Sequence, residues 1–156
     1  MTSQQKAFLD MIAWSEIGPA LLAESDDGYN VLVGSTPAKP LLFTSYADHP
    51  NVYNAAMNST AAGRYQLLYR WWVPYKQMLG LMDFSPASQD AVALQQIRER
   101  GALPLIESGA ITSAISRCSN IWASLPGNNY GEHTNAIPAL LEAFKTSGGA
   151  ISAALA

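Results

Sequence analysis

The sequence predicts an α+β fold that is mostly helical and carries a small β-sheet. Two observations support this: long stretches place apolar residues at helical spacing, and one short region combines strand-like runs with turn residues. The chain has 156 residues, of which 49% are hydrophobic and 13% charged. This is enough for a buried core without disulfides and too apolar for disorder. We therefore expect one domain spanning residues 1–156.

The first helix is expected to run from residue 2 to a Gly-Pro pair at residues 18–19. Thr2 and Gln5 have the spacing of a capping box, in which a hydroxyl residue is followed three positions later by Gln. Leu9 and Ile12 lie on one stripe of this helix. The glycine and proline end it.

Glu16 continues the apolar stripe of this helix and is the first candidate catalytic residue. A carboxylate that loses water has its charged form disfavoured and its pKa raised, which suits a general acid near neutral pH. The alternative is a helix-end glutamate that turns back to solvent, because buried glutamate is rare. This segment alone leaves both interpretations open.

The remaining elements follow in order along the chain. Two short strands at residues 29–34 and 41–43 form a possible hairpin, and a polar surface loop follows. Aromatic residues at helical spacing predict a second helix that starts near Tyr65 and ends at Gly80. Ser85 and Pro86 begin the next helix, with a buried face of Ala87, Ala91, Leu94 and Ile97. Later helices are expected near residues 103–107, 111–117 and 137–145, and the tail from about residue 147 is expected to be flexible.

Several functional classes are disfavoured by composition. The net charge of −3 argues against nucleic-acid binding. Cys118 lies in a helical pattern and is interpreted as a core thiol. His49, His133 and this cysteine lack metal-ligand spacing, so we expect no metal and no cofactor. No basic region is followed by a long apolar run, so we expect no secretory signal and no membrane insertion.

With these segments in order, the chain resembles the lambda-type phage lysozymes, the endolysins that cleave peptidoglycan as lytic transglycosylases. The resemblance covers about Lys6 to about Lys145. The matching positions, read from the sequence, are residues 6–11, 13–16, 28–29, 31, 33–34, 62–68, 70–72, 84–86, 88–97 and 118–127. Long ordered runs of this kind are more specific than any short motif.

The resemblance implies a single lysozyme-like catalytic domain with a substrate cleft between two flexible lips, near residues 48–59 and 127–135. It implies that Glu16 is the catalytic acid and base, acting on peptidoglycan glycan strands. We expect a monomer and, in the absence of a secretory signal, storage in the host cytoplasm before lysis. The resemblance implies that a holin then opens the membrane, so that the protein reaches the periplasm and cell wall. The chain departs from the family pattern in residues 17–27 and in the lips.

The candidate substrate-binding residues are polar or aromatic and fall within or near the matching stretches. We expect Tyr65 and Gln66 to hydrogen-bond sugar amides and hydroxyls. Arg64 is expected either to meet a lactyl or peptide carboxylate or to form a structural salt bridge. For Trp122, core packing is favoured over stacking on a sugar. The full set is Tyr46, Ser59, Arg64, Tyr65, Gln66, Asn120, Trp122 and Tyr130.

Two rival functions stay open at this point. The first is a hydrolytic muramidase, in which a second carboxylate activates water or forms a covalent intermediate; Asp26, Asp27 and Asp48 are the available choices. The second is a peptidoglycan-binding or structural phage protein without turnover. In the transglycosylase mechanism no second carboxylate is required, because the 6-hydroxyl of the muramyl sugar closes the anhydro ring.

Overall fold

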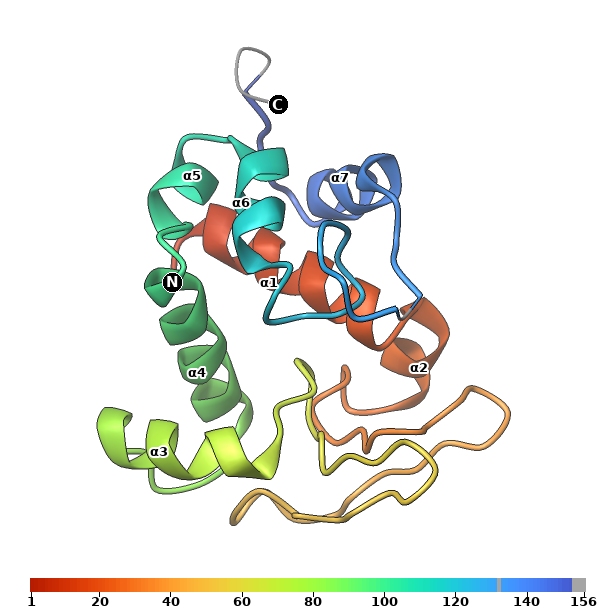
Figure 1. Cartoon of the computed structure of the whole chain (residues 1–156). Helices are drawn as coiled ribbons and strands as arrows, with labels where there is room; N and C mark the ends of the chain where they lie inside the picture. The colour runs from red at the N-terminus through yellow and green to blue at the C-terminus, as the bar shows by residue number, and fades with distance from the viewer. Residues whose placement is uncertain (132, 153–156) are drawn as a thin grey trace. The chain divides into compact units, whose positions relative to one another are not determined.

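Regular secondary structure in this protein is helical. The computed structural model describes residues 1–131 and 133–152, and within them the chain forms seven α-helices (Figure 1). None of the helices in these residues is long and apolar enough to cross a membrane. The helices are α1 (Ser3–Glu16), α2 (Pro19–Glu24), α3 (Tyr69–Leu79), α4 (Pro86–Glu99), α5 (Leu103–Glu107), α6 (Ile111–Cys118) and α7 (Ile137–Thr146).

The chain divides into two compact units. Unit 1 consists of Met1–Ser15 and Leu94–Ala156, and unit 2 of Glu16–Ala93. The chain passes from one unit to the other inside α1 and again inside α4. That the whole chain acts as a single catalytic domain stays a prediction.

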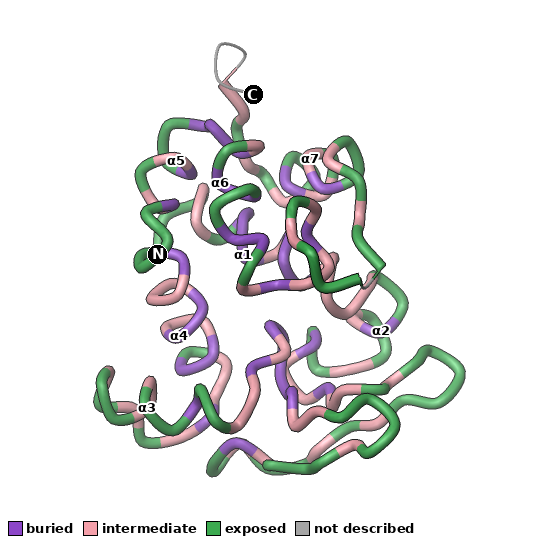
Figure 2. The backbone as a smooth tube through the Cα atoms, viewed as in Figure 1, coloured by how far each residue is buried: buried purple, intermediate pink, exposed green. Residues whose placement is uncertain are grey.

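Unit 1 is built on apolar helix faces. In the middle of α1, residues 7–9 and 11–13 are buried and Asp10 between them is half-buried, and Figure 2 shows most of this stretch in the colour of buried residues. Helix α6 packs against both α5 and α7. The largest fully buried side chains of this unit include Phe8, Leu9, Met11, Ile12, Ile97, Ile106, Ile111, Ile115, Leu125 and Phe144. This is the core that apolar spacing predicted.

The capping box at the start of α1 is confirmed. The backbone N–H of Gln5 donates to Oγ1 of Thr2 at 3.1 Å, and the backbone N–H of Thr2 donates to Oε1 of Gln5 at 3.2 Å. Two of the N–H groups that a helix start leaves unpaired are thereby satisfied. At the other end, Gly18 has φ 86°, a left-handed conformation that suits glycine, and α2 begins directly after it. The sequence interpretation had missed α2.

The C-terminal tail has partners as far as Ser152. The backbone N–H of Ala150 donates to Oε1 of Gln4 at 2.7 Å, and Nε2 of Gln4 donates back to the carbonyl of Ala150 at 2.9 Å. The N–H of Ser152 donates to the carbonyl of Gly109 at 3.1 Å. Residues 147–152 therefore do not extend freely from the core. The expected flexibility of residues 153–156 concerns positions outside the described part of the chain.

Unit 2 pairs its extended segments through single bridges. Val31 pairs with Leu42 in antiparallel sense, so the two predicted strands do meet, but neither becomes a regular strand. Prolines at residues 37 and 40 and the left-handed turn at Gly34 interrupt the ladder, because proline cannot donate to it. The remaining bridges are Leu32 with Ala62, Asn54 with Ser59 and Ala62 with Leu67.

The predicted helix start near Tyr65 is wrong. Residues 63–66 form a tight turn closed by the bridge between Ala62 and Leu67, and α3 begins only at Tyr69. Gln66 has φ 51°, which ends any helix at that point. Pro74 lies inside α3, and Gly80 ends the helix in a left-handed cap.

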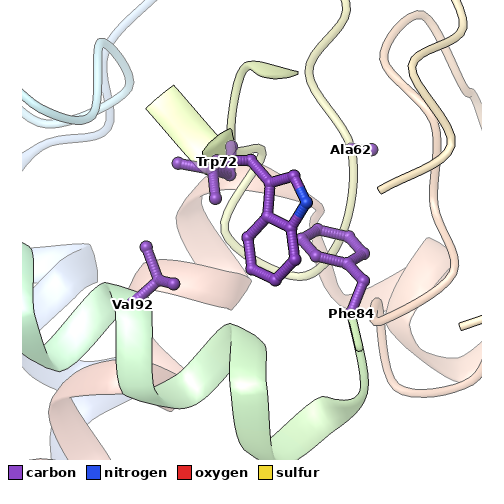
Figure 3. Packing of buried hydrophobic residues seen from close by; sticks show 5 residues of the cluster. Ala62, Trp72, Phe84 and Val92 are labelled. Atoms are coloured by element: carbon purple, nitrogen blue, oxygen red, sulfur yellow. The ribbon is translucent and has the colours of Figure 1, made fainter. Parts of the chain in front are cut away.

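An aromatic cluster forms the core of unit 2. Trp72 packs edge-on against Phe84 with ring centroids 4.9 Å apart, and Figure 3 shows the two rings in contact beside Ala62 and Val92. The ring of His49 also packs on Phe84, with the two ring centroids 4.9 Å apart. Aromatic pairs in this geometry add to the gain from area burial.

Helix α4 buries only part of the predicted face, with Ile97 buried as predicted and Leu94 half-buried. Ala87 is exposed and Ala91 half-buried, whereas Ser88, Gln89, Val92 and Ala93 are buried. The polar pair is buried because it has partners. Ser88 Oγ donates to Asp83 at 2.9 Å, and Nε2 of Gln89 donates to the carbonyl of Phe84 at 2.9 Å.

Candidate active site

Glu16 opens onto a groove of about 330 Å³ within unit 2. The groove is lined by the end of α1, by residues between there and the middle of α2, and by the segment that follows Tyr29. Glu16 itself is half-buried. The complete lining is Glu16, Ile17, Leu21, Val31, Leu32, Val33, Gly34, Ser35, Thr36, Met57 and Gln66.

The lining contains a single acidic side chain. Aliphatic residues make up most of the walls, and Ser35, Thr36 and Gln66 add neutral polar groups. Binding sites for organic ligands commonly have this character, mostly apolar with a few placed polar groups. Glu16 is therefore the one group lining this groove that can give or take a proton as an acid.

The residue before Glu16 is fixed within unit 1. Oγ of Ser15 lies 2.8 Å from Oγ of Ser124, and Nδ2 of Asn135 donates to Oγ of Ser15 at 2.9 Å. The N–H of Asn135 donates in turn to the carbonyl of Ser124 at 2.8 Å. The last turn of α1 is thus held by hydrogen bonds one residue before the carboxylate.

Gln66 is the predicted sugar-binding residue that the structure places in the same groove as Glu16. Its Nε2 donates to the carbonyls of Gly63 at 2.8 Å and Val31 at 3.2 Å. Both amide hydrogens are consequently engaged with the backbone. The amide oxygen accepts no hydrogen bond from the described residues, so Gln66 offers an acceptor in a fixed orientation.

Arg64 and Tyr65 are directed into unit 2 and do not line the groove. Each is 5% exposed. Nε of Arg64 donates to the carbonyl of Asp27 at 2.9 Å, and Nη1 donates to the hydroxyl of Tyr65 at 3.0 Å. The Tyr65 hydroxyl donates to Asp90 Oδ1 at 2.6 Å. The salt-bridge alternative for Arg64 has support, because Nη2 lies 3.5 Å from Asp27 Oδ2; sugar binding by either residue stays a prediction.

Tyr29 completes this internal network. Its hydroxyl donates to the same Asp90 oxygen at 2.9 Å, and the Arg64 guanidinium lies 5.2 Å from its ring centroid. Burial raises the pKa of Tyr29 to about 12, with the Asp90 charge adding to the effect. Burial likewise raises the pKa of Tyr65. Both phenols stay protonated and serve as donors.

Gly63 permits a close approach, but the group that approaches belongs to this chain. A side chain at residue 63 would collide with Oε1 of Gln89, and the backbone there has φ 87°. That Oε1 accepts from the N–H of Arg64 at 2.9 Å. Glycine at this position therefore lets Gln89 fix the turn that carries Gln66.

The three aspartates considered as second carboxylates do not line the groove of Glu16. Asp26 accepts from the Tyr46 hydroxyl at 2.5 Å, and Asp27 pairs with Arg64. Asp48 accepts from Nε1 of Trp72 at 2.7 Å. Burial opposes ionisation of Asp48, but this hydrogen bond, the N–H of His49 and the charge of Lys76 lower its pKa overall.

Two further candidates of unit 2 lie outside this groove. Tyr46 is half-buried, packs edge-on against Phe43 at 5.6 Å and has its pKa raised by burial and by Asp26. Ser59 lines a second groove, which is described below.

The other three candidates belong to unit 1. Trp122 is 2% exposed, in agreement with core packing, whereas Tyr130 is 56% exposed. The Tyr130 hydroxyl donates to the carbonyl of Asn120 at 2.9 Å. The side-chain amide of Asn120 is oriented so that both its nitrogen and its oxygen have partners, and the oxygen accepts from Nη1 of Arg100 at 2.8 Å. Tyr130 belongs to the predicted second lip, in which residue 132 lies outside the described part of the chain.

Sequence reasoning missed most of the groove walls. The sequence predicts only a strand for residues 31–34, only a loop for Met57, and no role for Ser35 and Thr36. No local signal marks them, because their contribution depends on bridges to Leu42 and Ala62 that are distant in sequence. The left-handed Gly34 beside a run of apolar residues is the one indication of an irregular wall.

The remaining reactive side chain is a core thiol. Cys118 is buried, and burial raises its pKa to about 12, which makes thiolate chemistry unfavourable. Within residues 1–131 and 133–152, no group of three or more His, Cys, Asp or Glu side chains is placed to hold a metal ion.

Comparisons with known proteins agree with this architecture. Residues 6–151 match the model of the endolysin family. The chain is 54% identical to the endolysin of Escherichia phage lambda, over 97% of this chain and 95% of that protein. It is 48% identical to the endolysin of Escherichia phage P2, over 92% of each.

A solved structure gives the same result for the fold. Bacteriophage lambda lysozyme complexed with a chitohexasaccharide superposes with a TM-score of 0.88 and 52% identity, covering 97% of this chain and 98% of that one. A second structure of lysozyme from bacteriophage lambda has a TM-score of 0.84. The lysozyme-like fold expected from the sequence is confirmed, and the chain belongs to the endolysin family.

Proposed function

We propose that this endolysin cleaves the β-1,4 bond between N-acetylmuramic acid and N-acetylglucosamine as a lytic transglycosylase, leaving a 1,6-anhydro-muramyl end. Family membership and the lysozyme fold support the coarser statement, cleavage of a cell-wall glycan. The solved lambda lysozyme complex contains a chitohexasaccharide, a glycan ligand. The finer statement depends on the chemistry available around Glu16.

The observation that carries the proposal is the single carboxylate of the groove. Glycosidases that use water or a covalent intermediate generally place two carboxyl groups roughly 5 to 10 Å apart across the scissile bond. The three aspartates considered above as second carboxylates are engaged with Tyr46, Arg64 and Trp72. A mechanism that needs one carboxyl group fits these residues better than one that needs two.

The reaction then uses Glu16 twice. The protonated carboxyl group donates its proton to the glycosidic oxygen, and the bond to C1 of the muramyl sugar breaks as positive charge develops on that sugar. The substrate's own acetamido group stabilises this charge. The Glu16 carboxylate next removes the proton from the muramyl 6-hydroxyl, whose oxygen bonds to C1 and closes the anhydro ring. Glu16 ends protonated, and no water is consumed.

Gln66 positions the sugar in this proposal. Its amide nitrogen is engaged with the carbonyls of Gly63 and Val31, so its oxygen is held toward an N–H or O–H donor. The acetamido N–H and the hydroxyls of the glycan are such donors. A preorganised acceptor costs little ordering entropy when the substrate binds.

Storage and release belong to the same proposal. We expect the protein to accumulate in the host cytoplasm and to reach the wall after a holin opens the membrane. Family resemblance supports this order of events. The test is lysis by induced cells with and without a co-expressed holin.

The test of the enzymatic proposal is mass spectrometry of the muropeptides released from purified peptidoglycan. The native protein is expected to release anhydromuramyl ends, lighter than reducing ends by one water, and Glu16→Gln is expected to release none. Glu24→Gln is the matched control, because Glu24 is exposed and does not line the groove. Reducing ends would support the hydrolase instead. Binding without any release by the folded native protein would support the non-catalytic alternative.

A further inference from the structure

Unit 2 contains a second groove, of about 420 Å³, that has no role in the proposed mechanism. It lies between the hairpin closed by Asn54 and Ser59 and the first residues of α3. Its lining residues come from two stretches of the chain, Asn51, Tyr53, Asn58, Ser59 and Thr60 from the first and Leu68, Tyr69 and Arg70 from the second.

The polar groups of this groove are mainly donors. The Tyr53 hydroxyl donates to Oδ1 of Asn58 at 2.7 Å, which leaves the two N–H bonds of that amide for another acceptor. The hydroxyl oxygens of Ser59 and Thr60 accept from the N–H groups of Ala61 and Tyr69, at 3.0 and 3.1 Å. Their O–H bonds are therefore available as donors as well.

The only charged residue in the lining is a cation. Arg70 is exposed, and its guanidinium lies 5.4 Å from the ring centroid of Trp71. None of the described carboxylates forms a salt bridge with it. Asp48, near the start of this loop, is instead paired with Lys76 at 3.4 Å and bonded to Trp72. One guanidinium, several neutral donors and two phenol rings suit an organic carboxylate.

The geometry points to this groove as a binding site for a carboxylate of the peptide stem carried by the glycan substrate. The inference rests on the proposed function, which places a glycan in the groove of Glu16. The two grooves share one hairpin, because Met57 lines the first whereas Asn58 and Ser59 line the second. A peptide attached to a bound muramyl sugar has a route to Arg70 across this hairpin, and the rings of Tyr53 and Tyr69 cover its apolar part.

The kinetic test compares Arg70→Gln with the native protein on two substrates, peptidoglycan with intact stems and glycan strands stripped of peptide by an amidase. We expect kcat/KM to fall about fivefold on the intact substrate, mainly through KM, and to stay unchanged on the stripped strands. Arg98→Gln removes another exposed arginine, which belongs to α4 and lies outside the groove, and is expected to change neither rate. Arg70→Lys keeps the charge without the bidentate fork and should recover part of the loss.

Each other outcome contradicts the inference in a different way. Equal losses on both substrates would mean that Arg70 acts on the sugar, on its lactyl carboxylate or on the fold. No loss on either would mean that the groove does not bind substrate. A direct measurement separates this from failure of the proposed function, namely NMR titration of the native protein with a free stem tetrapeptide. Shifts of the Arg70 and Asn58 side-chain signals are expected, and they should disappear when the peptide carboxylates are amidated.

Discussion

The two units of this endolysin are stabilised by different kinds of interaction. Unit 1 buries the apolar faces of its helices, with Phe8, Ile115 and Phe144 fully buried. Unit 2 holds its irregular backbone with polar side chains, among them Gln89 and Arg64, which bond to backbone groups of other segments. The groove of Glu16 therefore depends on specific hydrogen bonds more than on regular secondary structure.

The largest expected effect on stability comes from a cavity in the core of unit 1. Phe144→Ala removes a fully buried ring of α7 and is expected to lower the free energy of unfolding by about 4 kcal/mol. Chemical denaturation followed by circular dichroism measures this. Met82→Ala, at a side chain that is 87% exposed, is the control and should stay within about 0.5 kcal/mol of the native protein. A loss below about 1 kcal/mol for Phe144→Ala would show that α7 contributes little to the core.

The second largest effect is expected from a substitution that breaks the polar network of unit 2. Arg64→Met keeps apolar bulk but leaves the Asp27 carbonyl and the Tyr65 hydroxyl without their guanidinium donor. We expect the free energy of unfolding to fall by about 2 kcal/mol. Hydrogen exchange should show the loss of protection mainly within residues 16–93. Arg98→Met, on an exposed face of α4, serves as the control. Protection lost equally in both units would contradict the distinction between them.

The secondary structure of unit 1 was easier to predict from the sequence than that of unit 2, because the two units are stabilised by different interactions. Apolar spacing locates helices such as α1, α6 and α7, since burial of one face is what holds them. The spacing of Tyr65, Leu68, Tyr69 and Trp72 looked equally helical, yet Gln66 adopts a left-handed conformation and the hydroxyl of Tyr65 bonds to Asp90, 25 residues away. Such long-range partners leave no periodic signal in the sequence.

The candidate site was predictable in its centre and not in its surroundings. Glu16 and Gln66 fall in stretches that resemble the family, and both line the groove. The neighbouring Arg64 and Tyr65 belong to the same stretch but are buried. Which residues of a matching run face a ligand depends on turn geometry, here on the turn at residues 63–66.

A smaller effect is expected at the start of α1. Thr2→Ala removes the hydroxyl that accepts from the N–H of Gln5, and a lost cap of this kind costs about 1 kcal/mol. Thermal unfolding measures the change, and Thr2→Ser should restore most of it. The same hydroxyl donates to Glu107 at 2.5 Å, so Glu107→Gln separates the cap from this second bond. Equal stability of Thr2→Ala and the native protein would mean that the helix end does not limit the stability of unit 1.

The smallest effect concerns pH and unit 2. Burial lowers the pKa of His49 below its ordinary value of 6.5. Its Nδ1 accepts from the N–H of Asn51 at 3.0 Å while Nε2 lies 2.7 Å from the carbonyl of Leu67, an arrangement that the neutral ring satisfies. The unfolded chain therefore binds a proton more readily than the folded one, and stability should fall as pH decreases from about 6.5. His49→Gln should flatten this dependence in urea titrations; an unchanged slope would show that His49 does not cause it.

In the proposed mechanism one carboxyl group, that of Glu16, cleaves the glycan without water. The most direct test is digestion of purified peptidoglycan in water enriched in oxygen-18, followed by mass spectrometry of the new muramyl ends. We expect anhydro ends that carry no heavy oxygen, formed by the native protein and by Glu24→Gln but not by Glu16→Gln. Reducing ends that carry one heavy oxygen at C1 would contradict this mechanism, because water would then have entered the reaction.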